Sequence, residues 1–238
     1  MTTSSNGATP LPVIGLIALF VTSLVVGQLL AVKVIALPLP VALPVVGASI
    51  IAPAGVLAYA VTFFASDCYA ELYGRRSAQR VVNIAFLMNF VMLALLWLAI
   101  VAPGSPAGAD PAAFARVLSP STGIVIGSLV AYVVSQNWDV LAFHFLRERT
   151  RGRYLWLRNI GSTATSQALD TVIFITIAFW VVPVVLGIGT PSSAGLLAKL
   201  IVGQYLLKLL IALLDTPFVY AVVGYAKSTG IGVRQATI

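Results

Sequence analysis

The chain has 238 residues, of which 60% are hydrophobic and only 9% are charged, and its mean hydropathy is +1.02. Soluble domains carry about 25% charged residues, so this composition excludes a soluble enzyme and a disordered protein and predicts a protein of the lipid bilayer. One cysteine and one histidine provide neither an intrachain disulfide nor a metal-ligand cluster, so we expect no metal and no cofactor.

Six apolar runs are each long enough to cross the ~30 Å hydrocarbon core, which takes about 20 helical residues. We expect all six to be helices, because an isolated strand leaves backbone groups without hydrogen bonds in lipid. They form one transmembrane domain over 11–226, between a flexible N-terminus at 1–10 and a cytoplasmic tail at 227–238. The runs are Leu11 to Val32, Ser49 to Ala65, Val81 to Val101, Thr122 to Phe145, Ile160 to Leu186 and Leu197 to Tyr225.

The segment after the first run is rich in proline. Pro38, Pro40 and Pro44 fall at even spacing among valines and leucines, between Lys33 and Gly47. Proline interrupts helices but is tolerated in extended edge strands. We therefore expect an extended or hairpin cover at the outer face, between the first two helices.

Basic residues sort the loops into two groups. One group follows the second and fourth helices and continues into the tail, whereas the opposite loops hold only Lys33, Arg116 and Lys199. By the positive-inside rule, both termini are cytoplasmic. The net charge of +7 is therefore attributed to topology, and no nucleic-acid partner is expected. The cytoplasmic basic residues are Arg75, Arg76, Arg80, Arg147, Arg149, Arg151, Arg153, Arg158, Lys227 and Arg234.

Two of the predicted helices contain the same polar motif. Ser135, Gln136, Asp139 and Phe143 in the fourth run match Ser166, Gln167, Asp170 and Phe174 in the fifth. The two helices cross the membrane in opposite directions, as inverted repeats do in many transporters. Because polar residues inside a membrane are costly and usually functional, we expect these two motifs to form a shared site.

A further pair of charges is predicted near the midplane. At ~1.5 Å of rise per residue, Asp170 lies about 15 Å from the cytoplasmic end of its helix, and Lys208 lies about 16 Å from the outer end of the sixth. We expect them to form an ion pair, which either belongs to the binding site or only locks two helices together. Asp215 lies in the inner half of the sixth helix, beside Pro217.

Two acids mark the inner end of the second helix. Asp67 and Glu71 are four residues apart and are followed by Arg75. This spacing fits interfacial ion pairs along one helix, and it equally fits an inner gate.

Four segments together resemble the queuosine precursor transporters, a family formerly called vitamin uptake transporters. Their order and spacing cover most of the chain after residue 50. The segments are SDCYAELYGRRSAQRVV from Ser66, SQNWDVLAF from Ser135, SQALDTVIF from Ser166 and KLLIALLDTPFVY from Lys208.

The resemblance implies a six-helix importer of a 7-deazaguanine base, such as 7-cyano- or 7-aminomethyl-7-deazaguanine, for tRNA modification. Such a base has N–H groups that a carboxylate or amide accepts and a carbonyl that accepts from a donor. An aromatic ring such as Trp138 or Tyr132 would stack on it. The expected substrate-binding residues are Gln136, Asn137, Trp138, Asp139, Gln167, Asp170, Lys208 and Asp215.

Two other functions are weighed against import of such a base. The first is the substrate-binding subunit of an energy-coupling vitamin transporter, and the second is an intramembrane enzyme acting on a lipid. Against the enzyme, the sequence has no GxSG motif and no HExxH motif. The expected location is the cell membrane, the inner one, with lipids and a small nucleobase-like molecule as partners and with homodimer formation left open.

Overall fold

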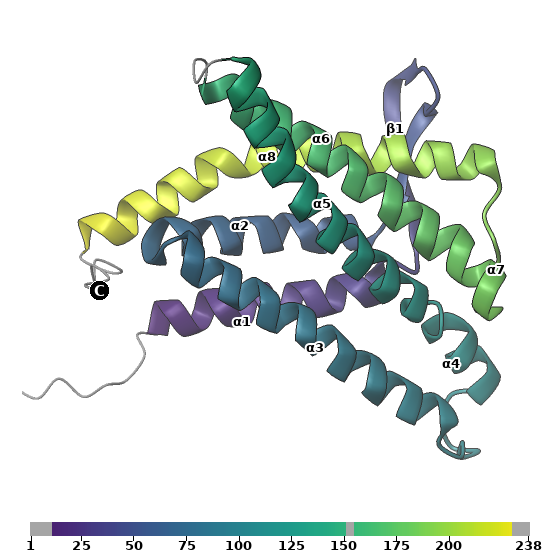
Figure 1. Cartoon of the computed structure of the whole chain (residues 1–238). Helices are drawn as coiled ribbons and strands as arrows, with labels where there is room; N and C mark the ends of the chain where they lie inside the picture. The colour runs from purple at the N-terminus through teal and green to yellow at the C-terminus, as the bar shows by residue number, and fades with distance from the viewer. Residues whose placement is uncertain (1–10, 151–154, 230–238) are drawn as a thin grey trace, which may run out of the picture.

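The computed structural model describes residues 11–150 and 155–229, with side chains from residue 160 in the second range (Figure 1). Arg151, Arg153, Arg234, the expected flexible N-terminus and most of the expected tail lie outside this part, and so does the side chain of Arg158. The elements are α1 (Leu11–Leu30), β1 (Val34–Leu43), β2 (Gly47–Pro53), α2 (Gly55–Tyr73), α3 (Arg75–Val101), α4 (Pro111–Leu118), α5 (Ser121–Arg149), α6 (Leu155–Thr176), the π-helical turn η1 (Ile177–Val181), α7 (Val182–Leu186) and α8 (Ala194–Ser228).

Five helical segments of the described chain are long and apolar enough to cross a membrane, which makes this a multi-pass membrane protein. The remaining predicted span, the second along the chain, corresponds to α2, which has 19 residues and is not one of the five. Its polar C-terminal end, with Asp67 and Glu71, lowers its hydropathy. The five segments are Leu11–Leu30, Arg75–Val101, Pro111–Arg149, Ile160–Leu186 and Ala194–Ser228.

The predicted limits of the second helix were wrong at both ends. Residues 49–53 are not helical, because they pair with β1 as strand β2, and the helix begins at Gly55. At the other end, the helix continues past Ala65 through the polar residues to Tyr73. It ends at Gly74, whose φ of +87° is readily adopted by glycine alone.

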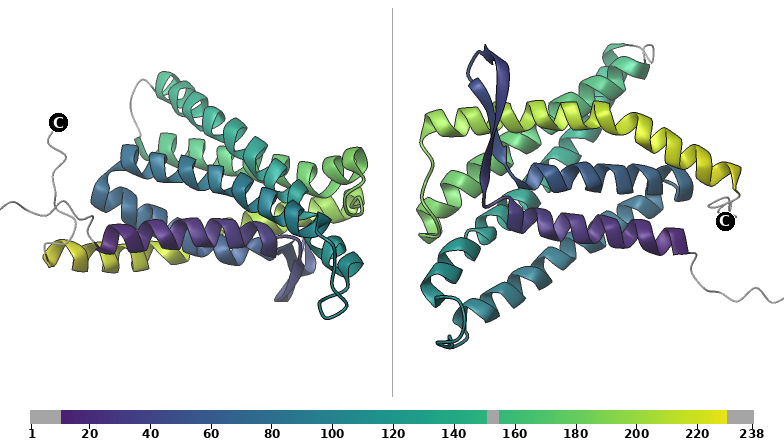
Figure 2. Two further views of the ribbon diagram at one scale, coloured as in Figure 1. Left: turned by 90° about the horizontal axis from the view of Figure 1, so that it is seen from below. Right: turned by 180° about the vertical axis from the view of Figure 1, so that it is seen from behind.

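The proline-rich segment folds as an antiparallel hairpin. Val34 pairs with Pro53 and Pro38 pairs with Ser49, and the register becomes irregular between Pro38 and Leu43. The hairpin crosses α8, as the rear view in Figure 2 shows, and extends beyond it. The crossing is close because Gly203 has no side chain: a Cβ there would collide with the carbonyl oxygen of Ile51.

Small residues allow the helices to approach one another. Gly123 and Gly127 of α5 lie against Ala178 and the backbone of Phe174, and a Cβ on either glycine would come within 3.0 Å of a carbonyl oxygen. Gly27 of α1 similarly faces Ala58 of α2. Helices in lipid associate through such close contacts, because the surrounding acyl chains provide no hydrophobic drive between them.

The fifth span contains one local irregularity, which has an identifiable cause. Pro183 cannot donate a backbone hydrogen bond, so the carbonyl of Phe179, four residues earlier, loses its helical partner. The N–H of Ser192 donates to that carbonyl at 2.8 Å instead. The π-helical turn η1 ends two residues before this proline.

Candidate functional site

A central cavity of about 230 Å³ lies between α1, α2, α3, α5, α6 and α8. Both repeated motifs contribute to its wall. The polar lining residues are Thr62, Ser66, Ser128, Ser135, Gln136, Gln167, Asp170 and Lys208. The aromatic lining residues are Phe20, Tyr59, Phe63, Phe86, Tyr132 and Phe174.

The two copies of the motif bond to each other reciprocally. Helices α5 and α6 pack side by side. The hydroxyl of Ser135 lies 3.3 Å from Oδ1 of Asp170, and the hydroxyl of Ser166 lies 3.3 Å from Oδ1 of Asp139. Each serine therefore donates to the aspartate of the opposite copy. This exchange is the contact expected of two inverted segments related by a local two-fold axis.

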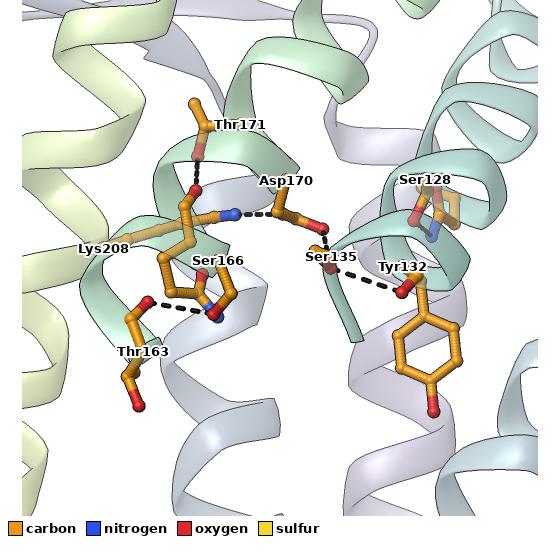
Figure 3. A network of polar contacts seen from close by, with 10 residues as sticks. Ser128, Tyr132, Ser135, Thr163, Ser166, Asp170, Thr171 and Lys208 are labelled. Atoms are coloured by element: carbon orange, nitrogen blue, oxygen red, sulfur yellow. Dashed lines mark hydrogen bonds and ion pairs between the residues drawn. The ribbon is translucent and has the colours of Figure 1, made fainter. Parts of the chain in front are cut away.

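Only one of the two aspartates has an ammonium partner among the described contacts. Nζ of Lys208 lies 2.6 Å from Oδ2 of Asp170 (Figure 3), so the predicted ion pair is present. The lysine side chain is 6% exposed and the aspartate side chain is 22% exposed. The carboxylate thus receives Ser135 on one oxygen and Lys208 on the other, at the cavity wall.

One wall of the cavity is aromatic. The rings of Phe86 and Tyr132 are stacked with centroids 4.2 Å apart, and the Tyr132 hydroxyl bonds to the side chain of Gln79. Across the cavity, Nζ of Lys208 lies 5.8 Å from the centroid of Tyr59. A flat ring and a line of hydrogen-bonding groups therefore border the same space.

Sequence reasoning missed most of this aromatic wall. Tyr59 and Phe63 are four residues apart and share a face of α2, and Phe86 lies on α3. The i,i+4 spacing of Tyr59 and Phe63 was the one available signal, but it is also common on lipid-facing surfaces. Tyr132 was one of two aromatic residues expected to stack, and it lines the cavity.

Four of the expected substrate-binding residues are not among those that line the central cavity: Asp215 lines a different cavity, and the other three lie on α5. Asn137 is exposed, and its Nδ2 donates to the carbonyl of Val133 one turn earlier at 2.7 Å. Trp138 is 45% exposed, and its Nε1 donates to the hydroxyl of Thr165 at 3.2 Å. Asp139 is half-buried and bonds Ser166. Trp138 and Asp139 thus join α5 to α6 beside the cavity.

The remaining expected residues line two further cavities. A middle cavity of about 420 Å³ lies between α2, α6 and α8, and its wall includes Asp67, Gln167, Lys208 and Asp215. An end cavity of about 460 Å³ lies where α2 and α8 end and α3 begins. Its polar lining residues are Asp67, Glu71, Arg75, Thr216, Tyr220 and Lys227.

The described residues contain no group of three or more histidine, cysteine, aspartate and glutamate side chains that could hold a metal ion. The chemistry at the central cavity is instead hydrogen bonding. Asp170 and the two glutamine carbonyls accept, whereas the glutamine amides, the serine hydroxyls and Lys208 donate. Such a set, opposite an aromatic face, suits a planar molecule with donors and acceptors along its edge.

The family model and the relatives that match this chain point to the same family. The family model described as "Putative vitamin uptake transporter" matches residues 53–222. A protein of Bacillus subtilis (strain 168) named "Probable queuosine precursor transporter" is 34% identical over 174 residues, which is 70% of this chain and 69% of that protein. A protein of Escherichia coli (strain K12) named "Queuosine precursor transporter" is 29% identical over 130 residues, 53% of this chain and 54% of that protein. No solved structure matches the chain.

Proposed function

The chain belongs to the queuosine precursor transporter family, and on this premise we propose that it imports a 7-deazaguanine base for tRNA modification. The substrate would be a base such as 7-cyano- or 7-aminomethyl-7-deazaguanine. The two relatives are named "Probable queuosine precursor transporter" and "Queuosine precursor transporter". Transport, and not catalysis, is the proposed activity of the chain.

One observation supports the proposal most directly. Gln136 and Gln167, the matching residues of the inverted motifs, line a single cavity together with Asp170 and Lys208. In this proposal the carboxylate of Asp170 accepts N–H groups of the base, and Lys208 or a glutamine amide donates to its carbonyl. A base that lacks one of these donors would leave a buried acceptor unpaired, at a cost of about 1 to 3 kcal/mol, which gives selectivity.

The aromatic wall supports the same proposal. We assign the stacking role to Tyr132 and Phe86, which already stack on one another at the cavity. Base stacking on an aromatic side chain contributes about 1 to 3 kcal/mol in other base-binding sites. For Trp138, Asn137 and Asp139, we propose a supporting role in joining α5 to α6.

The topology of the transporter follows from its charges. We propose six spans, with α2 as the second, and both termini in the cytoplasm. The hairpin then lies toward the outer face. The partners are a small nucleobase-like molecule and membrane lipids.

The matched aspartates of the repeat provide the test. Uptake of labelled precursor is measured in cells that cannot synthesise it, together with the queuosine content of their tRNA. Asp170→Asn should abolish uptake, because it removes the carboxylate that pairs with Lys208 and accepts hydrogen bonds from the base. Asp139→Asn, at the matching position outside the cavity lining, should retain most of it, provided that the membrane content of both variants equals that of the unmodified chain. Full uptake by Asp170→Asn would reject the proposed site.

A further inference from the structure

The three cavities lie next to one another in a row. The central and middle cavities share Phe63, Gln167 and Lys208 as lining residues, and the middle and end cavities share Asp67. Cavities that share a lining residue are neighbours in the structure. The row therefore runs from the paired motifs along α2 and α8 to the ends of these helices.

The basic residues indicate which side of the membrane the row reaches. The end cavity is bordered by Arg75 and Lys227, which belong to the basic group that the positive-inside rule assigns to the cytoplasm. In the opposite direction, Gly123 and Gly127 bring α5 into contact with η1 and Phe174. Phe174, Ala178 and Leu200 are part of one buried cluster there. The described structure is thus packed on the outer side of the central cavity and hollow on the inner side.

The boundary between the central and middle cavities has a simple composition. Phe63 comes from α2, Gln167 from α6 and Lys208 from α8, so each of the three helices contributes one side chain. Two of the three can hydrogen-bond a polar molecule, and the third presents an apolar ring. Beyond this boundary, Asp67 and Asp215 again offer carboxylate acceptors.

We propose that the structure is the inward-facing state of the transporter and that Phe63, Gln167 and Lys208 form an inner partition that the base passes on its way to the cytoplasm. This inference rests on the proposed function and adds its exit route, between α2, α6 and α8. Gln167 and Lys208 then have two roles, since they bind the base from one side and border its exit on the other. Asp67 and Asp215 line the route after the partition.

Accessibility to a water-soluble thiol reagent tests the route without any substrate. Cys68 is the only cysteine of the chain and is fully buried, so Cys68→Ala gives a cysteine-free background. In this cysteine-free background, Ala212→Cys places a thiol in the middle cavity. The control, Leu213→Cys, places a thiol at the next residue, which is 72% exposed and lines none of the three cavities. A charged methanethiosulfonate should label Ala212→Cys many-fold faster than Leu213→Cys in inside-out vesicles, because the proposed route gives the reagent access to the middle cavity from the cytoplasmic side.

Each outcome of this labelling decides whether the proposed inward route exists. Equal labelling of the two variants, or faster labelling of Ala212→Cys from the outer side, overturns the inward route. Neither result depends on whether the base is the substrate, because no base is present. Conversely, normal labelling without uptake of labelled precursor would reject the proposed function and leave the hollow route in place.

The partition itself is tested with a reporter in the central cavity. Ala131 is 1% exposed and lines that cavity, so a thiol in Ala131→Cys lies behind the partition. Phe63→Ala should speed its labelling from the cytoplasmic side several-fold, because it removes the apolar ring from the boundary. Phe64→Ala, which changes the next residue and not a cavity wall, should leave the rate unchanged. Equal rates in the two variants would show that Phe63 does not form the partition.

Discussion

The pair formed by Asp170 and Lys208 has a structural role as an ion pair and a proposed role in substrate binding, and the two are separable by mutation. A charge left alone in a low-dielectric interior costs several kcal/mol, so each partner stabilises the other. The same two side chains line the central cavity, where they offer an acceptor and a donor. A pair used only as a lock between α6 and α8 could be replaced by apolar residues of similar size without loss of function.

We expect Lys208→Met to destabilise the protein by about 3 kcal/mol, because Asp170 loses its partner. The double variant Asp170→Leu, Lys208→Met should recover most of this loss, since no charge remains unpaired. It should nevertheless fail to take up labelled precursor. Thermal unfolding in detergent and cellular uptake measure the two effects. Uptake by the double variant would identify the pair as a lock alone.

Sequence reasoning identified part of the polar lining of the central cavity, namely Gln136, Gln167, Asp170 and Lys208, but not Thr62, Ser66 or Ser128. An aspartate and a lysine at matching depth in apolar helices have few alternatives to pairing, and this pair is present. The motif also indicated that α5 and α6 face each other. The direction of each side chain was less accessible. Trp138 adjoins Asp139 in the sequence, yet it bonds Thr165 and is partly exposed, because a position on a helix does not specify which neighbour covers it.

At the scale of elements, the hairpin and α8 depend on each other. Strand β2 crosses α8 at Gly203, and Ala52, Val56 and Leu207 form a small buried cluster beside this crossing. Leu207 precedes Lys208, so the strand supports the turn of α8 that carries the ammonium group. The hairpin is therefore one of the elements that position the site.

Gly203→Val should destabilise the protein by about 1 to 3 kcal/mol, the usual cost of forcing extra atoms into a packed contact. The added side chain meets the carbonyl of Ile51 and separates the hairpin from α8. Thermal unfolding in detergent measures the change. Gly195→Val is the matched control, because a Cβ at Gly195 has no neighbour within 4 Å. Equal stability of the two variants would contradict the role given to the crossing.

The hairpin also shows why element limits were harder to predict than element types. Ile50, Ile51 and Ala52 are as compatible with a membrane helix as with a strand. Their strand conformation is decided by pairing with Ile35, Ala36 and Leu37, which lie on the other side of a turn. Apolar composition alone cannot reveal such pairing. The same limitation applies to the inner end of α2, where polar residues continue the helix instead of ending it.

For the whole molecule, the distribution of charge predicts the orientation in the membrane. A fluorescent protein that matures only in the cytoplasm should be fluorescent when it is fused after residue 238. A phosphatase that is active only in the periplasm should be inactive at the same position. Fusion within the loop between α3 and α4 should give the opposite result, because Arg116 is the only basic residue near it. Phosphatase activity at the C-terminus would place the end cavity on the outer side and contradict the proposed exit route to the cytoplasm.

The length of α8 has a consequence for the lipid around it. Its 35 residues span about 52 Å at 1.5 Å each, whereas the hydrocarbon layer is about 30 Å thick. Such hydrophobic mismatch is relieved by tilt, by bending or by local thickening of the bilayer. Pro217 lies inside this helix, where proline removes a backbone hydrogen bond and allows a kink. The helix changes direction toward its C-terminal end in Figure 1. Acyl-chain length should therefore alter the angle at which the C-terminal third of α8 leaves the membrane.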